Sequence, residues 1–173
     1  SELKVGNPFD PGSNLGALVS QAHLNKVKSY IDSASSQGGK ILFGGERVQV
    51  PGFESGYYLQ PTIIEVQDNS CTLNQEEIFG PVVTLMSFES DAQALEMAND
   101  VKYGLSATVW TNNLNRTMKI SKELHTGIVW VNTWLLRDLR TPFGGAKASG
   151  VGREGGFEAL RFFTEPKNIC IQY

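Results

Sequence analysis

Residues 82–131 read VVTLMSFESDAQALEMANDVKYGLSATVWTNNLNRTMKISKELHTGIVWV. Apolar runs in this stretch predict strands at residues 82–88, 107–110 and 128–131. Between them, apolar residues recur at helical spacing in two segments. The first follows the capping box Ser90-x-x-Gln93, and the second follows Asn112-Asn113. The order is therefore strand, helix, strand, helix, strand. It predicts an α/β fold with a mostly parallel, doubly wound sheet, helices on both faces, and functional residues at the carboxyl ends of strands.

Local signals extend this pattern in both directions. Ser20 is suited to cap a helix whose apolar residues recur at helical spacing until Gly38 and Gly39 stop it. The other predicted elements are strands at residues 40–43, 62–66 and 168–171 and a short helix at residues 157–163.

The composition is that of a globular protein. Of the 173 residues, 40% are hydrophobic, enough for one sizeable core. The formal net charge of −3 gives no basic patch for nucleic acid or anionic lipid, and no apolar run reaches the roughly 20 residues of a membrane-spanning helix. The two cysteines form neither a disulfide framework nor a zinc-binding pattern. We therefore expect a cytoplasmic protein with no metal site, whose partners are small molecules or proteins.

One candidate site is Glu76-Glu77-Ile78-Phe79-Gly80-Pro81, which places two carboxylates and an aromatic ring at a tight turn before a strand. Two interpretations stay open. In the first, the turn is a solvated acidic surface with Phe79 packed into the core. In the second, one carboxylate accepts hydrogen bonds from a ligand hydroxyl while the ring packs on a flat ligand face, because carboxylates bind ribose-type diols well.

A second candidate site is the loop of residues 132–145, which leaves a predicted strand and enters a glycine-rich segment. It carries two arginines and two aromatic residues, namely Arg137, Arg140, Trp134 and Phe143. Guanidinium groups match carboxylates bidentately, so the loop can form an anion-binding pocket. The alternative is an ordinary surface loop whose arginines are paired with Asp138 or another neighbour.

Two further patterns do not predict a site. A dinucleotide fingerprint needs a buried strand before its glycines and an acidic residue about 20 residues later, and Gly150-x-Gly152-x-x-Gly155 has neither, because Ala146 to Ser149 does not resemble a strand. Cys71 has acidic neighbours rather than the electropositive setting of a catalytic thiolate, so we interpret it as a packed cysteine. Cys170, in the last predicted strand, is interpreted as a core or interface residue.

Several motifs together resemble the C-terminal part of the NAD(P)-dependent aldehyde dehydrogenases, in order and spacing, from about Val5 to the end. They are residues 6–10 (GNPFD), 56–62 (GYYLQPT), 76–81 (EEIFGP), 103–105 (YGL), 127–132 (GIVWVN) and 142–145 (PFGG). Within that family, residues 134–142 (WLLRDLRTP) are most similar to the 2-aminomuconic and 2-hydroxymuconic semialdehyde dehydrogenases.

The resemblance implies a fold of the aldehyde dehydrogenase catalytic-domain type and a role for particular residues. Residues 1–148 would be a portion of the catalytic domain, residues 149–163 a glycine loop with a short helix, and residues 164–173 the oligomerisation strand of a homo-oligomer. The implied cofactor-binding residues are Glu77, for the nicotinamide-ribose hydroxyls, and Phe79, near the nicotinamide ring. The implied substrate-binding residues are Arg140 and Arg137 for a substrate carboxylate, with Phe143, Trp134 and Leu135 along the aldehyde tunnel.

The resemblance also implies what this chain does not contribute. In the family, the catalytic cysteine, the general-base glutamate, the oxyanion-hole asparagine and the Rossmann domain lie upstream of the matching segment, so no residue here is assigned a catalytic role. The complete enzyme would oxidise a carboxylate-bearing semialdehyde to the acid through a thioester on that cysteine and pass hydride to NAD or NADP. This chain alone is expected to be inactive and not to bind the cofactor tightly. The alternative is a non-catalytic assembly or binding module that retains the fold.

Overall fold

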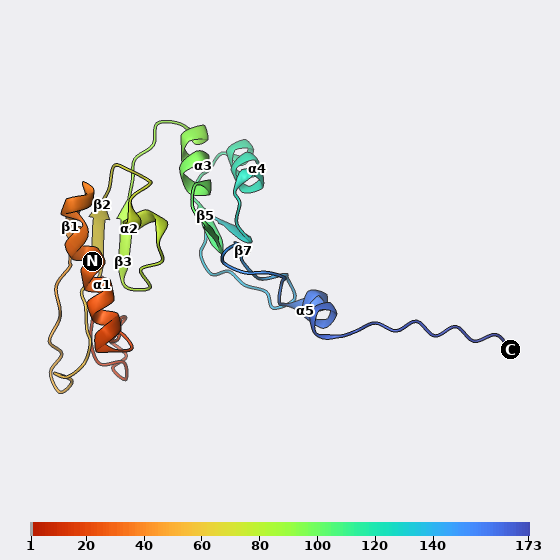
Figure 1. The fold of residues 1–173 in the computed structure, drawn as a ribbon, viewed down its shortest axis with the longest axis horizontal. Helices are drawn as coiled ribbons and strands as arrows, with labels where there is room; N and C mark the ends of the chain where they lie inside the picture. Colours follow the sequence, from red (N-terminus) through yellow and green to blue (C-terminus); the bar gives the residue numbers. More distant parts are fainter. Residues whose placement is uncertain (1) are drawn as a thin grey trace. The chain divides into compact units, whose positions relative to one another are not determined.

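The computed structural model describes residues 2–173, and contacts within the chain divide it into two units, Ser1–Ser87 and Phe88–Tyr173 (Figure 1). Each unit combines helices with a small sheet, and each contains one pair of parallel strands. The α/β class predicted from the sequence is therefore confirmed. Among residues 2–173, no helix is both long enough and apolar enough to cross a membrane.

The first unit is built around helix α1 (Gln21–Ser33). The Ser20 side chain accepts a hydrogen bond from the backbone N–H of His23, which confirms the predicted N-cap. The helix is followed by the short 3-10 turn η1 (Ser35–Gln37), just before the two glycines predicted to stop it. One face of α1 enters a core made of Leu24, Val27, Ile31, Ala34, Leu59, Ile64, Val66, Cys71, Leu73 and Ile78.

The sheet of the first unit has the order β1-β2-β3. Strand β1 (Lys40–Phe43) pairs antiparallel with β2 (Thr62–Glu65), and β2 pairs parallel with β3 (Val82–Leu85), with Thr62 opposite Val82. A one-turn helix, α2 (Thr72–Gln75), lies in the connection between β2 and β3. The turn that follows α2 leads directly into β3 and carries the first candidate site.

The second unit contains the remaining elements, which are α3 (Asp91–Asn99), β4 (Tyr103–Gly104), β5 (Ser106–Val109), α4 (Leu114–Glu123), β6 (Ile128–Val131), β7 (Ala146–Lys147) and α5 (Gly156–Phe163). Ser90 caps α3 through its side chain, as the sequence predicts, and the Asn113 side chain caps α4. Strands β5 and β6 are parallel and joined through α4, whereas β4 and β7 are antiparallel. The second candidate site lies in the loop between β6 and β7.

The structure differs from the prediction in which sheet each strand belongs to. The three strands between residues 82 and 131 do not form one sheet, because β3 pairs with β2 in the first unit while β5 pairs with β6 in the second. A short strand, β7, also occupies Ala146–Lys147, where none was predicted. It is a two-residue antiparallel partner of β4, a type of strand too short to give a periodic signal.

Residues 164–173 contain neither helix nor strand, and their side chains are exposed. They continue from α5 as an extended segment at the blue end of the chain (Figure 1). A strand needs a neighbour for its N–H and C=O groups, so the strand predicted at residues 168–171 is not formed within a single chain. Cys170 is exposed there and is not a core residue of this chain, whereas Cys71 is buried, as predicted. The assembly role of this segment stays a prediction.

Candidate functional site

The turn between α2 and β3 presents two carboxylates, Glu76 and Glu77, and one aromatic ring to solvent. Ile78 enters the core, with 8% of its surface exposed, while Phe79 is 71% exposed and has a left-handed φ of 59°. The part of the first interpretation that packs Phe79 into the core is therefore wrong, whereas the acidic turn is solvent-exposed as that interpretation has it. Glu77 is also exposed, and its carboxylate makes no hydrogen bond or ion pair with any residue from 2 to 173. The geometry leaves both groups available to a ligand.

The same turn is held against α1 at three points. The Nε2 atom of His23 lies 2.6 Å from the carbonyl oxygen of Phe79, and the Tyr30 hydroxyl donates a 2.5 Å hydrogen bond to Glu76. Gly80 lies so close to the helix that a Cβ there would be 2.7 Å from a methyl carbon of Val27. The position of the turn is thus set by residues that are distant in the sequence.

The loop between β6 and β7 begins in a fixed conformation. Asn132 has a φ of 53°, and its side chain exchanges two 2.8 Å hydrogen bonds with the backbone of Thr111. Two residues further on, Trp134 is 69% exposed and Leu135 is 52% exposed. The indole N–H of Trp130, on β6, then donates to the carbonyl oxygen of Leu136 at 2.9 Å. These bonds tie the loop to the parallel pair β5–β6.

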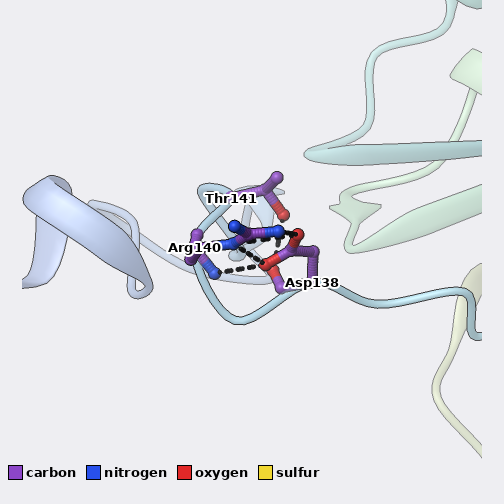
Figure 2. A network of polar contacts seen from close by, with 3 residues as sticks. All are labelled: Asp138, Arg140 and Thr141. Atoms are coloured by element: carbon purple, nitrogen blue, oxygen red, sulfur yellow. Dashed lines mark hydrogen bonds and ion pairs between the residues drawn. The ribbon is translucent and has the colours of Figure 1, made fainter.

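Arg140 is paired with a neighbour in its own loop (Figure 2). Its Nε atom donates to Asp138 Oδ1 at 2.9 Å, and a second guanidinium nitrogen contacts Oδ2. The backbone N–H and the hydroxyl of Thr141 both donate to the carbonyl oxygen of Asp138. The hydrogen bonds from Arg140 lower the pKa of the Asp138 carboxyl and raise the pKa of the guanidinium. The Arg140 side chain nevertheless remains 88% exposed.

Arg137 has a different environment. Its guanidinium carbon lies 3.9 Å from the centroid of the Phe143 ring, and one of its nitrogens lies 3.4 Å from a carboxylate oxygen of Glu154. Phe143 and Glu154 are themselves joined by two 2.8 Å backbone hydrogen bonds. Together with Phe163 they line a hollow of about 360 Å3. Of the predicted substrate-binding residues, Arg137 and Phe143 line this hollow, whereas Arg140, Trp134 and Leu135 lie outside its lining.

The side chain of Arg153 forms hydrogen bonds with backbone carbonyls on both sides of the glycine-rich segment after β7. One guanidinium nitrogen of Arg153 donates to the carbonyl oxygens of Gly145 and Gly152, at 2.8 and 2.7 Å. A strand does precede this segment, but it is an antiparallel strand of two residues. A dinucleotide fingerprint follows a strand of a parallel sheet, so the segment is still not interpreted as one. Among residues 2–173, no three His, Cys, Asp or Glu side chains are grouped so as to hold a metal ion.

Sequence reasoning did not identify His23, Tyr30, Arg153 or Glu154 as parts of these sites. His23 and Phe79 are 56 positions apart, and Arg137 and Glu154 are 17 apart. No local pattern reports such pairs. The one available signal was the helical spacing of seven residues between His23 and Tyr30, which places them on the same face of α1.

The model of the aldehyde dehydrogenase family matches residues 1–169. This chain belongs to the aldehyde dehydrogenase family. The 2-aminomuconic semialdehyde dehydrogenase of Bos taurus is 48% identical over 174 residues, covering 98% of this chain and 36% of that protein. The 2-hydroxymuconic semialdehyde dehydrogenase of Pseudomonas sp. strain CF600 is 45% identical over 171 residues, with 98% and 35% covered. The aldehyde dehydrogenase chain thus spans about a third of the length of these relatives.

A solved structure supports the same assignment. The betaine aldehyde dehydrogenase of Staphylococcus aureus, solved in complex with NAD+, superposes with a TM-score of 0.88 at 38% sequence identity. The match covers 94% of the aldehyde dehydrogenase chain described here and 32% of the staphylococcal chain. The family resemblance seen in the sequence motifs is therefore confirmed at the level of the fold.

Proposed function

We propose that this chain is the C-terminal portion of an NAD-dependent enzyme that oxidises a carboxylate-bearing semialdehyde to the corresponding acid. The observation that carries the proposal is its identity of 44 to 48% with 2-aminomuconic and 2-hydroxymuconic semialdehyde dehydrogenases along 98% of its length. The thioester of the reaction forms on a cysteine outside this chain, since neither Cys71 nor Cys170 has the setting of a nucleophile. Bound NAD+ supplies the acceptor for the hydride.

In this proposal, Glu77 and Phe79 hold the nicotinamide half of the cofactor. The residues present fit that group. The Glu77 carboxylate is exposed and unpaired within residues 2–173, so both oxygens can accept hydrogen bonds from the two ribose hydroxyls. The Phe79 ring is exposed beside it and can pack against a flat heteroaromatic ring. The staphylococcal relative, solved with NAD+, supports NAD as the cofactor.

The substrate carboxylate is recognised by the arginines of the loop between β6 and β7. Arg137 lines the same hollow as Phe143 and keeps guanidinium nitrogens that its single 3.4 Å ion pair with Glu154 does not occupy. Arg140 already pairs with Asp138 and therefore contributes a weaker, more solvated contact. Phe143 lines the aldehyde tunnel in this proposal, with Trp134 and Leu135 on its wall.

The remaining parts of the proposal concern assembly and location. Residues 164–173 pair with the sheet of a second copy and so build a homo-oligomer, which supplies the neighbour that this segment lacks in a single chain. Residues 1–148 are the catalytic-domain portion, and residues 149–163 connect it to the assembly segment. The enzyme works in the cytoplasm on a small-molecule aldehyde.

Replacing Glu77 by glutamine in the complete enzyme is expected to raise the KM for NAD+ about tenfold. Glutamine keeps one acceptor but loses the charge, and charge-assisted hydrogen bonds contribute about 1.5 to 3 kcal/mol. The measurement is steady-state kinetics with NAD+ varied at saturating aldehyde. The control is Glu65→Gln, which neutralises an exposed carboxylate at the end of β2. Unchanged NAD+ kinetics in the Glu77 variant would remove this residue from the cofactor site.

The chain of 173 residues on its own is expected to produce no reduced cofactor from NAD+ and a semialdehyde. Covalent catalysis needs an activated thiolate beside the aldehyde carbon, and loss of the nucleophile leaves only residual rates. The readout is the absorbance of the reduced nicotinamide cofactor. Turnover that disappears in a Cys71→Ser variant would overturn the assignment. Inactivity of the complete protein would instead favour the non-catalytic assembly module.

A further inference from the structure

The hollow beside the loop between β6 and β7 contains an ion pair and not a lone cation. Arg137 and Glu154 both line it, and the Nη2 atom of Arg137 lies 3.4 Å from the Oε1 atom of Glu154. Asp138 also lines the hollow, but its carboxylate is paired with Arg140 (Figure 2). The charges of Arg137 and Glu154 therefore balance each other at the place where a substrate carboxylate is proposed to bind.

The position of Glu154 beside Arg137 is fixed through its backbone. The N–H and C=O groups of Glu154 exchange two 2.8 Å hydrogen bonds with Phe143, whose ring centroid lies 3.9 Å from the guanidinium carbon of Arg137. The neighbouring Arg153 is hydrogen-bonded to two backbone carbonyls of the glycine-rich segment. One pair of bridged backbone segments thus brings both the Phe143 ring and the Glu154 carboxylate to Arg137.

The ion pair uses the guanidinium nitrogen that is most important for holding a carboxylate. A carboxylate binds a guanidinium bidentately along one of two edges, either Nε with Nη2 or Nη1 with Nη2. The Nη2 atom belongs to both edges, and it is the atom that Glu154 contacts. An incoming carboxylate that binds Arg137 through both oxygens therefore has to share Nη2 with Glu154 or displace Glu154 from it.

The ion pair is weak enough to be displaced. Its separation of 3.4 Å is longer than the roughly 2.7 to 2.9 Å of a charge-assisted hydrogen bond. The Arg137 and Glu154 side chains are 41% and 65% exposed, and ion pairs exposed to solvent contribute little to stability. The stacking of Arg137 on Phe143 does not involve the Glu154 carboxylate, so it can keep the guanidinium in the hollow after the pair opens.

We propose that the Glu154 carboxylate is an internal counter-charge on Arg137, which a ligand carboxylate must displace and which lowers the affinity of the hollow for acidic ligands. This inference rests on the proposed function of Arg137. The semialdehyde carries one carboxylate and its oxidised product carries two, so a negative charge at this place opposes retention of the product more than retention of the substrate. Glu154 thus limits product inhibition.

The test is the binding of adipate to the complete enzyme. Adipate is a dicarboxylate, and adipamide, its neutral diamide, is the matched ligand without charge. Titration calorimetry gives the dissociation constant directly, so the result does not depend on the catalytic activity of a variant.

The variants separate the charge of Glu154 from its shape. Glu154→Gln removes the charge and keeps the shape, and Glu154→Ala removes the carboxylate group altogether. Both variants retain the backbone bonds to Phe143. Glu158→Gln is the matched control, because Glu158 makes a similar 3.5 Å ion pair with Arg161 and does not line the hollow.

We expect both Glu154 variants to bind adipate about threefold more tightly than the parent, because a competing negative charge is removed. Adipamide binding should be unchanged in these variants, and adipate binding should be unchanged in Glu158→Gln. When Arg137 is already alanine, Glu154→Gln should give a clearly smaller gain, because the coupling between the two residues is then absent.

Two results would overturn the counter-charge. Unchanged or weaker adipate binding in the Glu154 variants would make Glu154 a residue that only orients Arg137. An equal gain with and without Arg137 would show that the Glu154 charge acts on the ligand directly and not through the guanidinium.

Arg137→Ala alone distinguishes this inference from the function on which it rests. If Arg137→Ala weakens adipate binding and the Glu154 variants do not strengthen it, carboxylate recognition by Arg137 stands and the counter-charge fails. If Arg137→Ala leaves adipate binding unchanged, carboxylate recognition by Arg137 fails, and the counter-charge fails with it.

Discussion

Replacing Arg137 by alanine in the complete enzyme is expected to cost about 2 to 4 kcal/mol in kcat/KM for a carboxylate-bearing semialdehyde, which is roughly a 30- to 700-fold loss. The guanidinium stacks on Phe143 and lines the same hollow, so its orientation is fixed before a ligand arrives. A charge-assisted contact from a preorganised group contributes more than one from a mobile side chain. The measurement is kcat/KM for an acidic semialdehyde and for a neutral aldehyde of similar size.

The neutral aldehyde is the decisive comparison. If Arg137 recognises a carboxylate, the neutral substrate should lose less than about threefold, since it has no charge to pair. Arg140→Ala serves as the matched variant, because Arg140 lies in the same loop but forms an ion pair with Asp138 and is largely exposed. Its effect on the acidic substrate should be clearly smaller. Equal losses on both substrates would make Arg137 a structural residue that holds Phe143 and Glu154.

Replacing Gly127 by alanine is expected to destabilise the second unit by about 3 kcal/mol, the upper part of the range for overpacking. A Cβ at this position would lie 1.7 Å from the carbonyl oxygen of Gly144 and 2.8 Å from its carbonyl carbon. Both atoms belong to the backbone, so no side-chain rotation can relieve the clash. Strand β6 or the loop ending at Gly144 has to move, which would also disturb Phe143.

Chemical denaturation followed by tryptophan fluorescence measures this effect, since the buried Trp130 lies on β6. Gly150→Ala is the matched control in the same unit. A Cβ there would come no closer than 3.6 Å to its neighbours, so we expect a change within about 1 kcal/mol. A Gly127 variant as stable as the Gly150 variant would contradict the close approach of the two backbone segments.

Local features of the fold could be predicted because their determinants are adjacent in the sequence. Ser20 and Ser90 cap helices through an N–H three residues away, and the apolar run of β6 begins and ends where the pattern predicts. The partner of β3 could not be predicted. An apolar run indicates a strand but does not say which other strand its N–H and C=O groups will meet.

In the candidate sites, too, contacts between residues close in the sequence were predictable and contacts between distant residues were not. The pairing of Arg140 with Asp138 spans two residues and was one of the alternatives open from the sequence. The exposure of Phe79 was not predictable, because Phe79 has a left-handed backbone conformation and its carbonyl oxygen contacts a histidine 56 residues away. The different environments of Arg137 and Arg140 likewise depend on Phe143 and Glu154, which the fold brings to one arginine and not to the other.

All three tryptophans, Trp110, Trp130 and Trp134, belong to the second of the two units. The first unit has a core and a sheet of its own, and its aromatic chromophores are tyrosine and phenylalanine. A fluorescence midpoint is therefore a property of residues 88–173, whereas far-ultraviolet ellipticity averages over both units. All-or-none cooperativity between two cores has to be demonstrated by coincident transitions from different probes. Until the two signals coincide, a single melting temperature does not describe this chain.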